Sequence, residues 1–296
     1  MSSLEKVLYF QAGIGVLPNM FLLLFYTFII LRHRPKLMDL ISCQLTLVHI
    51  MMFLTGGTMS LAYIFVSLNV NNDIKCKATF YTNRVMRGQS ICITCLLSVF
   101  QAITISPSTS LLAKFKHKLK KKYIINALCY IWFFNLSASS NMLFYVGGFT
   151  NVSETKQVKV TKSCSLFPMN YIIRGLSIIL STSRDVFLVA VMLTTSAYMV
   201  NVLHRHHRQC KHLHSINNRK ESPEKKATQT ILLLVIFFVV MYWADFIISL
   251  TSHLLWIYDP VVLTVQKFVI YAYPTITPLV KIIYDKRIIN VLKNLQ

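Results

Sequence analysis

Charged residues are scarce in this chain of 296 residues, at 14% of the sequence, whereas hydrophobic residues make up 54%. A soluble globular domain carries roughly a quarter charged residues, so the composition excludes that class. Several apolar runs reach about 18 residues or more, which is enough to cross the ~30 Å hydrocarbon core of a bilayer as a helix. The sequence therefore predicts an integral membrane protein.

Patterns of catalytic and metal-binding residues are missing as well. The chain has no buried Ser/His/Asp pattern, no carboxylate pair with a water path and no phosphate-binding loop, which are usual marks of an enzyme. The histidine-rich run from His204 to His214 lacks HExxH and any ordered Cys/His spacing. We interpret it as a solvated basic loop, and we expect no enzymatic activity, no metal and no cofactor.

The net charge of +21 does not indicate nucleic-acid binding, because the basic residues lie in the connections between apolar runs rather than on a polar, soluble fold. The apolar runs predict seven membrane spans in one domain covering residues 1–296, with a short cytoplasmic tail over 285–296. The approximate bounds of the spans are 6–31, 39–66, 77–106, 123–146, 171–202, 228–254 and 264–284. A transporter is the alternative from another class, but the internal repeats and paired broken helices of many transporters are not recognisable.

Lysine and arginine residues gather in alternate connectors. They are frequent after the first, third and fifth predicted spans and in the tail, and sparse in the other connectors. Basic connectors face the cytoplasm, so the N-terminus is expected outside and the C-terminus inside. The sequence thus predicts an all-α, seven-transmembrane helix bundle that is a multi-pass protein of the plasma membrane.

Two features agree with this orientation. Asn151 begins an Asn-Val-Ser glycosylation sequon in the second outer connector, where a lumenal transferase can reach it. Cys76, at the outer start of the third span, and Cys164, in the second outer connector, are the only two cysteines predicted to lie outside. Because the exterior is oxidising, we expect these two cysteines to form a disulfide.

Four stretches of the sequence resemble vomeronasal type-1 receptors, a family of G-protein-coupled receptors. They read "RPKLMDLISCQLTLVHIMMFLT", "CKATFYTNRVMRGQSICITCLLSVFQAITISPSTSLLAKFKHK", "RKESPEKKATQTILLL" and "YPTITPLVKIIYDKRIINVLKNLQ", and the similarity runs over nearly the entire chain. The resemblance implies chemosensory detection of pheromone-like small molecules and signalling through heterotrimeric G proteins of the inhibitory class. The type-2 taste receptors are the nearest confusable family, but the third-span block fits them poorly.

Departures from rhodopsin-like receptors fit the same family. The third span ends without an acidic-Arg pair, the second has no Asp at mid-depth, and the seventh has Thr277-Pro278 in place of Asn-Pro. Two residues depart from the vomeronasal pattern itself. Pro18 precedes Asn19 where a glycine is expected, and Lys281 occupies a usually apolar position. We expect neighbouring groups to accommodate the proline in its helix and the lysine to extend toward the cytoplasmic surface.

Ionisable residues inside the bilayer are candidates for function because each costs roughly 2.5–3.5 kcal/mol to insert. Arg84 and Arg87 in the third span, Asp185 in the fifth and Asp245 in the sixth are predicted at similar depths, facing a shared cavity. Two interpretations stay open, namely a structural ion pair such as Arg87 with Asp245, and direct contact with a ligand. The full set predicted for the ligand pocket is Arg84, Arg87, Asp185, Asp245, Arg174, Tyr242 and Asn83.

The predicted pocket suits a small, mostly apolar ligand with one or two polar groups, and its arginines favour an anionic group on that ligand. The inner surface is predicted to face the G protein, with anionic lipid of the membrane as a competing partner. The residues predicted to form this inner surface are Ser106, Pro107, Lys114, Lys116, Arg205, Arg208, Lys225 and Lys226.

Overall fold

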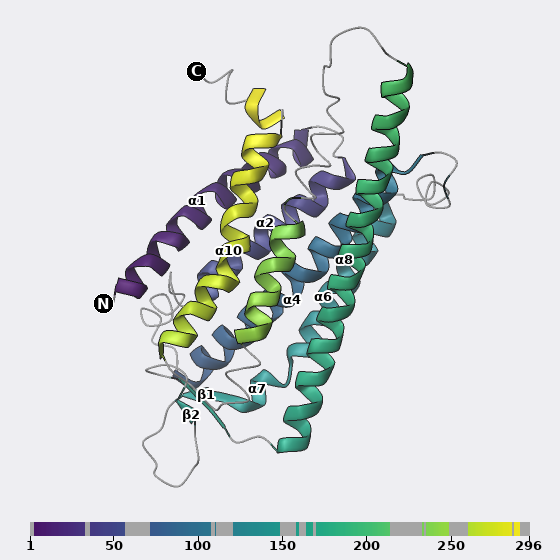
Figure 1. Cartoon of the computed structure of the whole chain (residues 1–296). Helices are drawn as coiled ribbons and strands as arrows, with labels where there is room; N and C mark the ends of the chain where they lie inside the picture. The colour runs from purple at the N-terminus through teal and green to yellow at the C-terminus, as the bar shows by residue number, and fades with distance from the viewer. Residues whose placement is uncertain are drawn as a thin grey trace.

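The computed structural model describes residues 3–32, 36–56, 72–107, 110, 121–148, 158–159, 164–167, 170–213, 233, 235–248, 260–285 and 287–290. Seven long helices run side by side in this part of the chain and form one bundle (Figure 1). They are α1 (Ser3–Arg32), α2 (Leu37–Thr55), α4 (Asn72–Ile105), α6 (Lys121–Ser139), α8 (Tyr171–Leu213), the unlabelled light green helix Val235–Ile248, and α10 (Pro260–Tyr284). Each of them overlaps one predicted span.

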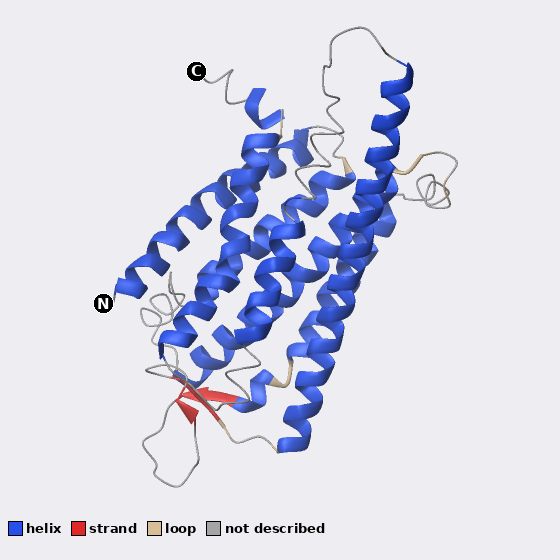
Figure 2. Ribbon diagram, viewed as in Figure 1, coloured by secondary structure: helices blue, strands red, loops and turns tan. Residues whose placement is uncertain are grey.

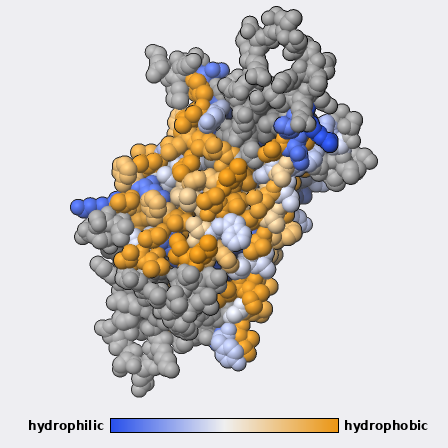
Figure 3. Space-filling model, in the orientation of Figure 1, coloured by the Kyte–Doolittle hydropathy of each residue, from blue (hydrophilic) through white to orange (hydrophobic). Residues whose placement is uncertain are grey.

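Apolar side chains cover much of the outside of the bundle. Leu17 of α1, Phe133 of α6 and Phe187 of α8 are all exposed, and a broad apolar belt crosses the middle of the visible face (Figure 3). Four of the described helices are long and apolar enough to cross a membrane, within Lys6–Arg32, Leu37–Thr55, Asn72–Ile105 and Tyr171–Val202. A continuous apolar surface of this kind is a liability in water and is suited to contact with lipid.

Helix α4 lies at the centre of the packing. One buried cluster packs it against α1, α2, α6 and α10, with Phe53, Ile93 and Leu128 among its members. A second cluster packs it against α8, the helix Val235–Ile248 and α10, with Met192 and Phe238 among its members. Since residues of α4 belong to both clusters, this helix positions the polar side chains that it carries relative to all the others.

Prolines in α10 create a hydrogen-bonding need that α1 satisfies. Pro278 has no N–H group, so the carbonyl of Pro274, four residues earlier, loses its partner within the helix. Asn19 of α1 donates from Nδ2 to this carbonyl at 2.9 Å and to the Gly15 carbonyl at 2.7 Å. Pro18 lies inside α1, which continues through it. The hydrogen bond from Asn19 to the Pro274 carbonyl therefore holds α1 against α10.

The connector between the fourth and fifth predicted spans, which is predicted to lie outside, contains a small sheet. After α7 (Met142–Tyr145), strands β1 (Val146–Gly148), β2 (Val158–Lys159) and β3 (Cys164–Leu166) pair antiparallel in the order β1-β3-β2 (Figure 2). The fourth helix was predicted to reach residue 146, but it ends at Ser139. The sequence SASSN followed by the Gly147-Gly148 pair explains the early end, since serine, asparagine and glycine are weak helix formers.

The sheet is fastened to the N-terminal end of α4. Cys76 of α4 and Cys164 of β3, the predicted pair, form a disulfide with a Cα–Cα distance of 5.7 Å. Asp73 accepts a hydrogen bond at Oδ1 from the backbone N–H of Gly148 at 3.1 Å and forms an ion pair with Lys77 at 2.8 Å. The start of the central helix is therefore tied to β1 and to β3.

Helix α8 is longer than the predicted fifth span. It continues to Leu213, so the run from His204 onward, interpreted as a loop, is helical as far as Leu213. The stretch 203–213 contains no glycine and no proline, and nothing in it ends a helix where the apolar run stops. The prediction of a loop was wrong for these residues.

A short helix over 287–290 follows α10 and docks on the bundle. Ile288 is fully buried against α1, and Arg287 pairs with Asp39 at the start of α2 at 2.8 Å and with Asp285 at 3.1 Å. Burial opposes the charge on Arg287, but the hydrogen bonds to these two carboxylates outweigh it and raise the pKa of the guanidinium. The chain after α10 is thus joined to α1 and α2 by packing and by charge.

Lys281 is accommodated by polar and aromatic neighbours near this same end. Its Nζ donates to the Ser42 hydroxyl of α2 at 3.1 Å. Its ammonium group also lies 5.8 Å from the centre of the Tyr26 ring of α1, within the range of a cation–π interaction. The lysine therefore adds a further contact among α1, α2 and α10.

Candidate functional site

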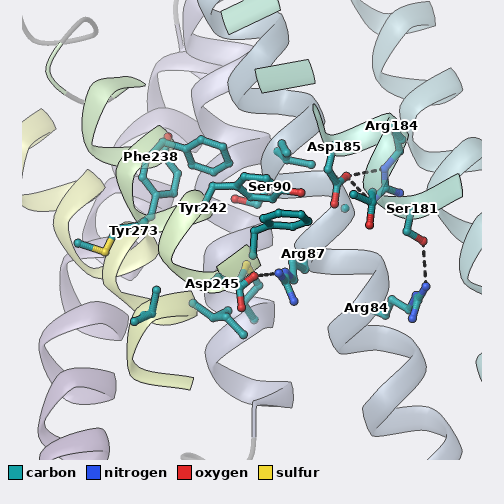
Figure 4. A pocket seen from close by; sticks show the side chains of 18 of the residues that line it. Arg84, Arg87, Ser90, Ser181, Arg184, Asp185, Phe238, Tyr242, Asp245 and Tyr273 are labelled. Atoms are coloured by element: carbon teal, nitrogen blue, oxygen red, sulfur yellow. Dashed lines mark hydrogen bonds and ion pairs between the residues drawn. The ribbon is translucent and has the colours of Figure 1, made fainter. Parts of the chain in front are cut away.

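A cavity of about 260 Å³ lies between α4, α8, the helix Val235–Ile248 and α10. Its wall combines charged, hydroxyl and aromatic side chains, several of which point toward one another (Figure 4). The labelled lining residues are Arg84, Arg87, Ser90, Ser181, Arg184, Asp185, Phe238, Tyr242, Asp245 and Tyr273. Because a charge is expensive to bury in a membrane, a gathering of ionisable groups here marks the site as a functional candidate.

Arg87 and Asp245 form an ion pair that links α4 to the helix Val235–Ile248. The Asp245 side chain is 4% exposed and that of Arg87 is 41% exposed. Gln266 of α10 donates from Nε2 to Asp245 Oδ1 at 3.1 Å. The carboxylate is thus buried and held from two helices, while the Arg87 side chain is more exposed.

Arg184 and Asp185, which are neighbours on α8, make a second pair at 2.7 Å. Arg184 also donates from Nη1 to Asn135 Oδ1 of α6 at 3.3 Å. This contact depends on Gly88 of α4, since a Cβ there would lie 2.1 Å from Asn135 Oδ1. The glycine therefore lets the α6 amide approach the cavity and orient Arg184.

Arg84 differs from the other two arginines of the cavity. Its Nη2 donates to the Ser181 hydroxyl of α8 at 3.0 Å, and Figure 4 shows this pair set apart from the two ion pairs. Within the described part of the chain, no carboxylate forms an ion pair with Arg84. The three arginines and two aspartates of the lining therefore leave one positive charge that is paired only with a hydroxyl.

Aromatic rings form the opposite wall and lead to a buried polar layer. Phe238 contacts the Tyr273 ring edge-on at 4.6 Å and stacks on Tyr242 with ring centres 6.3 Å apart. The Tyr273 hydroxyl lies 3.2 Å from Thr94 Oγ1. His49 of α2 is fully buried, with its ring edge-on to Tyr273 at 5.5 Å. The second span, which lacks an aspartate at mid-depth, thus carries a buried histidine that packs on α10.

The structure brings five of the seven predicted pocket residues to the cavity, namely Arg84, Arg87, Asp185, Tyr242 and Asp245. Asn83 is not among the lining residues and accepts a hydrogen bond from the Tyr271 hydroxyl at 3.4 Å. Arg174 lies in α8, but its side chain is outside the described structure. Asn135 and Gln266 support the charged residues and were not predicted; their sequence signal is a polar amide inside an apolar span.

The residues predicted for the inner surface are only partly described. Ser106 is buried, with its Oγ 2.9 Å from the Tyr198 hydroxyl of α8 and donating to the Ala102 carbonyl at 2.7 Å. Pro107 and Arg205 are exposed, whereas α8 includes Arg208 without a described side chain. The remaining predicted residues lie outside the described ranges, as does the sequon asparagine; they are Lys114, Lys116, Lys225, Lys226 and Asn151.

A bundle of long, apolar helices around a charged, aromatic-lined cavity fits a membrane protein that binds a small molecule. A family model described as the vomeronasal organ pheromone receptor family matches residues 2–294. Vomeronasal type-1 receptor 90 of Rattus norvegicus is 41% identical over 98% of this chain and 94% of its own length. Vomeronasal type-1 receptor 42 of Mus musculus is 36% identical over 99% of this chain and 89% of its own length.

The chain therefore belongs to the vomeronasal type-1 receptor family. It is a multi-pass membrane protein of the G-protein-coupled receptor class, and its family is one of chemosensory pheromone receptors rather than of enzymes. This is the family indicated by the third-span block of the sequence, in preference to the taste-receptor alternative.

Proposed function

We propose that this receptor binds a small, pheromone-like ligand from outside and activates a G protein of the inhibitory class. The seven helices would cross the membrane with the N-terminus outside and the C-terminus inside. The alternation of basic connectors supports this orientation, and so does the disulfide between the two cysteines predicted to lie outside. The ligand site is the cavity between α4, α8 and the helix Val235–Ile248.

The observation that carries the proposal is the arrangement of charge in this cavity. Two of its arginines are neutralised by aspartates, and Arg84 is held only by Ser181 within the described structure. A charged hydrogen bond from a ligand contributes roughly 1.5–3 kcal/mol. The ligand that fits best is mostly apolar, to pack on Phe238 and Tyr242, and carries one anionic group for Arg84.

Activation follows if the ligand binds one state of the bundle more tightly than the other. A ligand group that competes for Arg87 weakens its pairing with Asp245, and so loosens the helix Val235–Ile248 from α4. At the inner end, the Ser106–Tyr198 contact joins α4 to α8. The state in which these inner helix ends are apart is the one that the bound ligand favours and that the G protein recognises.

The basic inner residues serve two roles in this proposal. They determine the orientation of the chain in the membrane. Together with the exposed Arg205 of α8, they form the surface on which the G protein docks. Anionic lipid of the inner leaflet competes for the same charges, each basic residue contributing about 1 kcal/mol near the membrane surface.

Reconstitution in lipid nanodiscs with an inhibitory-class G protein tests the function directly. Guanine-nucleotide exchange is measured while a panel of volatile and steroid-like compounds, anionic and neutral, is titrated. Exchange that depends on ligand concentration and is absent from empty nanodiscs is the expected result. Absence of ligand-dependent exchange, together with compound flux into liposomes that contain the protein, would contradict the receptor function.

A further inference from the structure

A second cavity, of about 120 Å³, lies between α8 and the helix Val235–Ile248. We call it the apolar annex. It is lined by aliphatic and aromatic side chains, which are Val186, Val189, Ala190, Leu193, Tyr242, Trp243 and Phe246. Trp243 and Val186 are each 48% exposed, so the annex lies at the lipid-facing surface of the bundle. Nothing in the charged cavity's pairing of arginines and aspartates uses this space.

The annex adjoins the charged cavity and shares two wall residues with it. Tyr242 and Phe246 line both of them. Tyr242 stacks on Phe238, and Trp243 contacts Phe246 edge-on with ring centres 6.0 Å apart. A turn of the Phe246 or Tyr242 side chain about its own bonds is therefore the movement that would join the two spaces.

Size favours a single occupant for both spaces. The charged cavity, at about 260 Å³, is smaller than the ~300–1,000 Å³ of most ligand pockets, whereas the two together come to roughly 380 Å³. The annex is close in size to the ~150 Å³ apolar cavity that binds benzene, so it admits a group of roughly five carbons.

We propose that the annex receives the hydrocarbon end of a ligand whose anionic end lies on Arg84. The ligand class is thus an amphiphile with a polar head and an unbranched or ring hydrocarbon body. This assignment rests on the proposed function of the charged cavity, and adds to it the part of the site that selects for hydrocarbon length. Phe246 and Tyr242 act as the boundary across which the ligand extends.

Trp243 provides a reporter inside the annex. The chain has three tryptophans, and the double variant Trp132→Phe/Trp256→Phe leaves Trp243 alone. Straight-chain carboxylates of about 4 to 12 carbons with bromine on the last carbon are the probes, since bromine quenches tryptophan fluorescence on contact. Quenching is titrated on the whole receptor in nanodiscs.

Filling the annex separates binding from simple partition into lipid. Ala190→Phe places a ring in the annex from an exposed position, and Ala197→Phe is its matched control, seven residues further on the same face of α8 and also exposed. If Ala190→Phe lowers expression, Leu193→Phe fills the same space. Both variants are made in the single-tryptophan receptor.

The expected result is saturable quenching that strengthens with chain length and weakens about tenfold in Ala190→Phe, the loss expected when roughly two methylenes are excluded. Ala197→Phe is expected to bind as the parent does. Quenching that only rises linearly with probe, or that is equal in both variants, overturns the proposal and leaves partition into lipid as the explanation.

Nucleotide exchange with the functional panel keeps the two proposals distinguishable. If an amphiphilic agonist stimulates exchange with the same dose dependence in Ala190→Phe as in the parent, the proposed receptor function is supported and the proposed role of the annex is contradicted. Saturable, annex-dependent quenching without exchange for any compound does the reverse, because it retains the site and contradicts the signalling.

Discussion

The pair formed by Arg87 and Asp245 gives a prediction in which the two partners are not equivalent. Arg87→Met leaves a carboxylate that is 4% exposed with one remaining hydrogen bond, from Gln266 at 3.1 Å. Removing one partner of a buried pair costs about 3–5 kcal/mol. Asp245→Leu leaves an arginine whose side chain is 41% exposed, so we expect a loss of only about 1 kcal/mol.

The double variant Arg87→Met/Asp245→Leu removes both charges and keeps apolar groups of similar length. Replacing a whole buried pair in this way is often neutral or stabilising. We therefore expect the double variant to approach the wild type in stability, which corresponds to a coupling free energy of about 4–6 kcal/mol between the positions, the sum of the two single losses. A purely additive loss is the alternative outcome.

Thermal unfolding of the purified receptor in one detergent measures all four proteins of this cycle. The order of stability predicted is wild type and double variant highest, Asp245→Leu intermediate and Arg87→Met lowest. Equal losses for the two single variants, or a double variant as unstable as their sum, would refute the reasoning from burial. Nucleotide exchange on the same samples separates stability from function: a folded double variant without ligand response gives the pair a role in the response beyond stability.

Three further predictions concern helix packing and the disulfide. Gly88→Ala is expected to reduce surface expression several-fold because its Cβ would overlap a side chain of α6, whereas Gly175→Ala, with nothing within 4 Å, leaves it unchanged. Asn19→Leu is expected to lower stability by about 1–3 kcal/mol in thermal unfolding, since the α10 carbonyl loses its partner; a neutral result would contradict the link. Cys76→Ser and Cys164→Ser are each expected to lower the stability by about 2–5 kcal/mol, because each breaks the same disulfide. Equal unfolding temperatures of the wild type with and without reductant would contradict the disulfide.

Much of the helical architecture was predictable because a membrane imposes strong rules on sequence. Lipid leaves the backbone no partners outside the segment, so long apolar runs become helices, and the seven predicted spans all overlap observed helices. The pairing of Cys76 with Cys164 followed from the orientation alone. Hydropathy does not locate helix ends, however. The predicted bounds therefore missed the end of α6 at Ser139 and the continuation of α8 to Leu213.

The candidate site was predictable in its charged members but not in the amide residues that support them. An arginine or aspartate in an apolar span is conspicuous, so Arg87 and Asp245 were found, and their pairing was one of two open interpretations. The partners of Arg184 and of the Asp245 carboxylate, Asn135 and Gln266, depend on how α6 and α10 rotate about their axes. That rotation is set by tertiary packing, which hydropathy does not encode.

The apolar annex could not be predicted from sequence at all. Its residues are ordinary members of two apolar helices, and lipid-facing and cavity-facing valines or leucines look alike in a sequence. Only the spacing of α8 from the helix Val235–Ile248 separates Ala190 and Leu193, which line the annex, from Ala197, which does not.

The central claim, that the ligand binds in the charged cavity through Arg84, is tested most directly by one comparison of dose dependence. Nucleotide exchange is measured with an anionic agonist on the wild type, on Arg84→Ala, and on Lys77→Ala, which removes a positive charge seven residues away on α4 and outside the cavity. Loss of a charged hydrogen bond predicts that Arg84→Ala, at normal surface expression, needs roughly 10- to 100-fold more agonist. Lys77→Ala is predicted to respond as the wild type does. An unchanged dose dependence in Arg84→Ala would contradict the account.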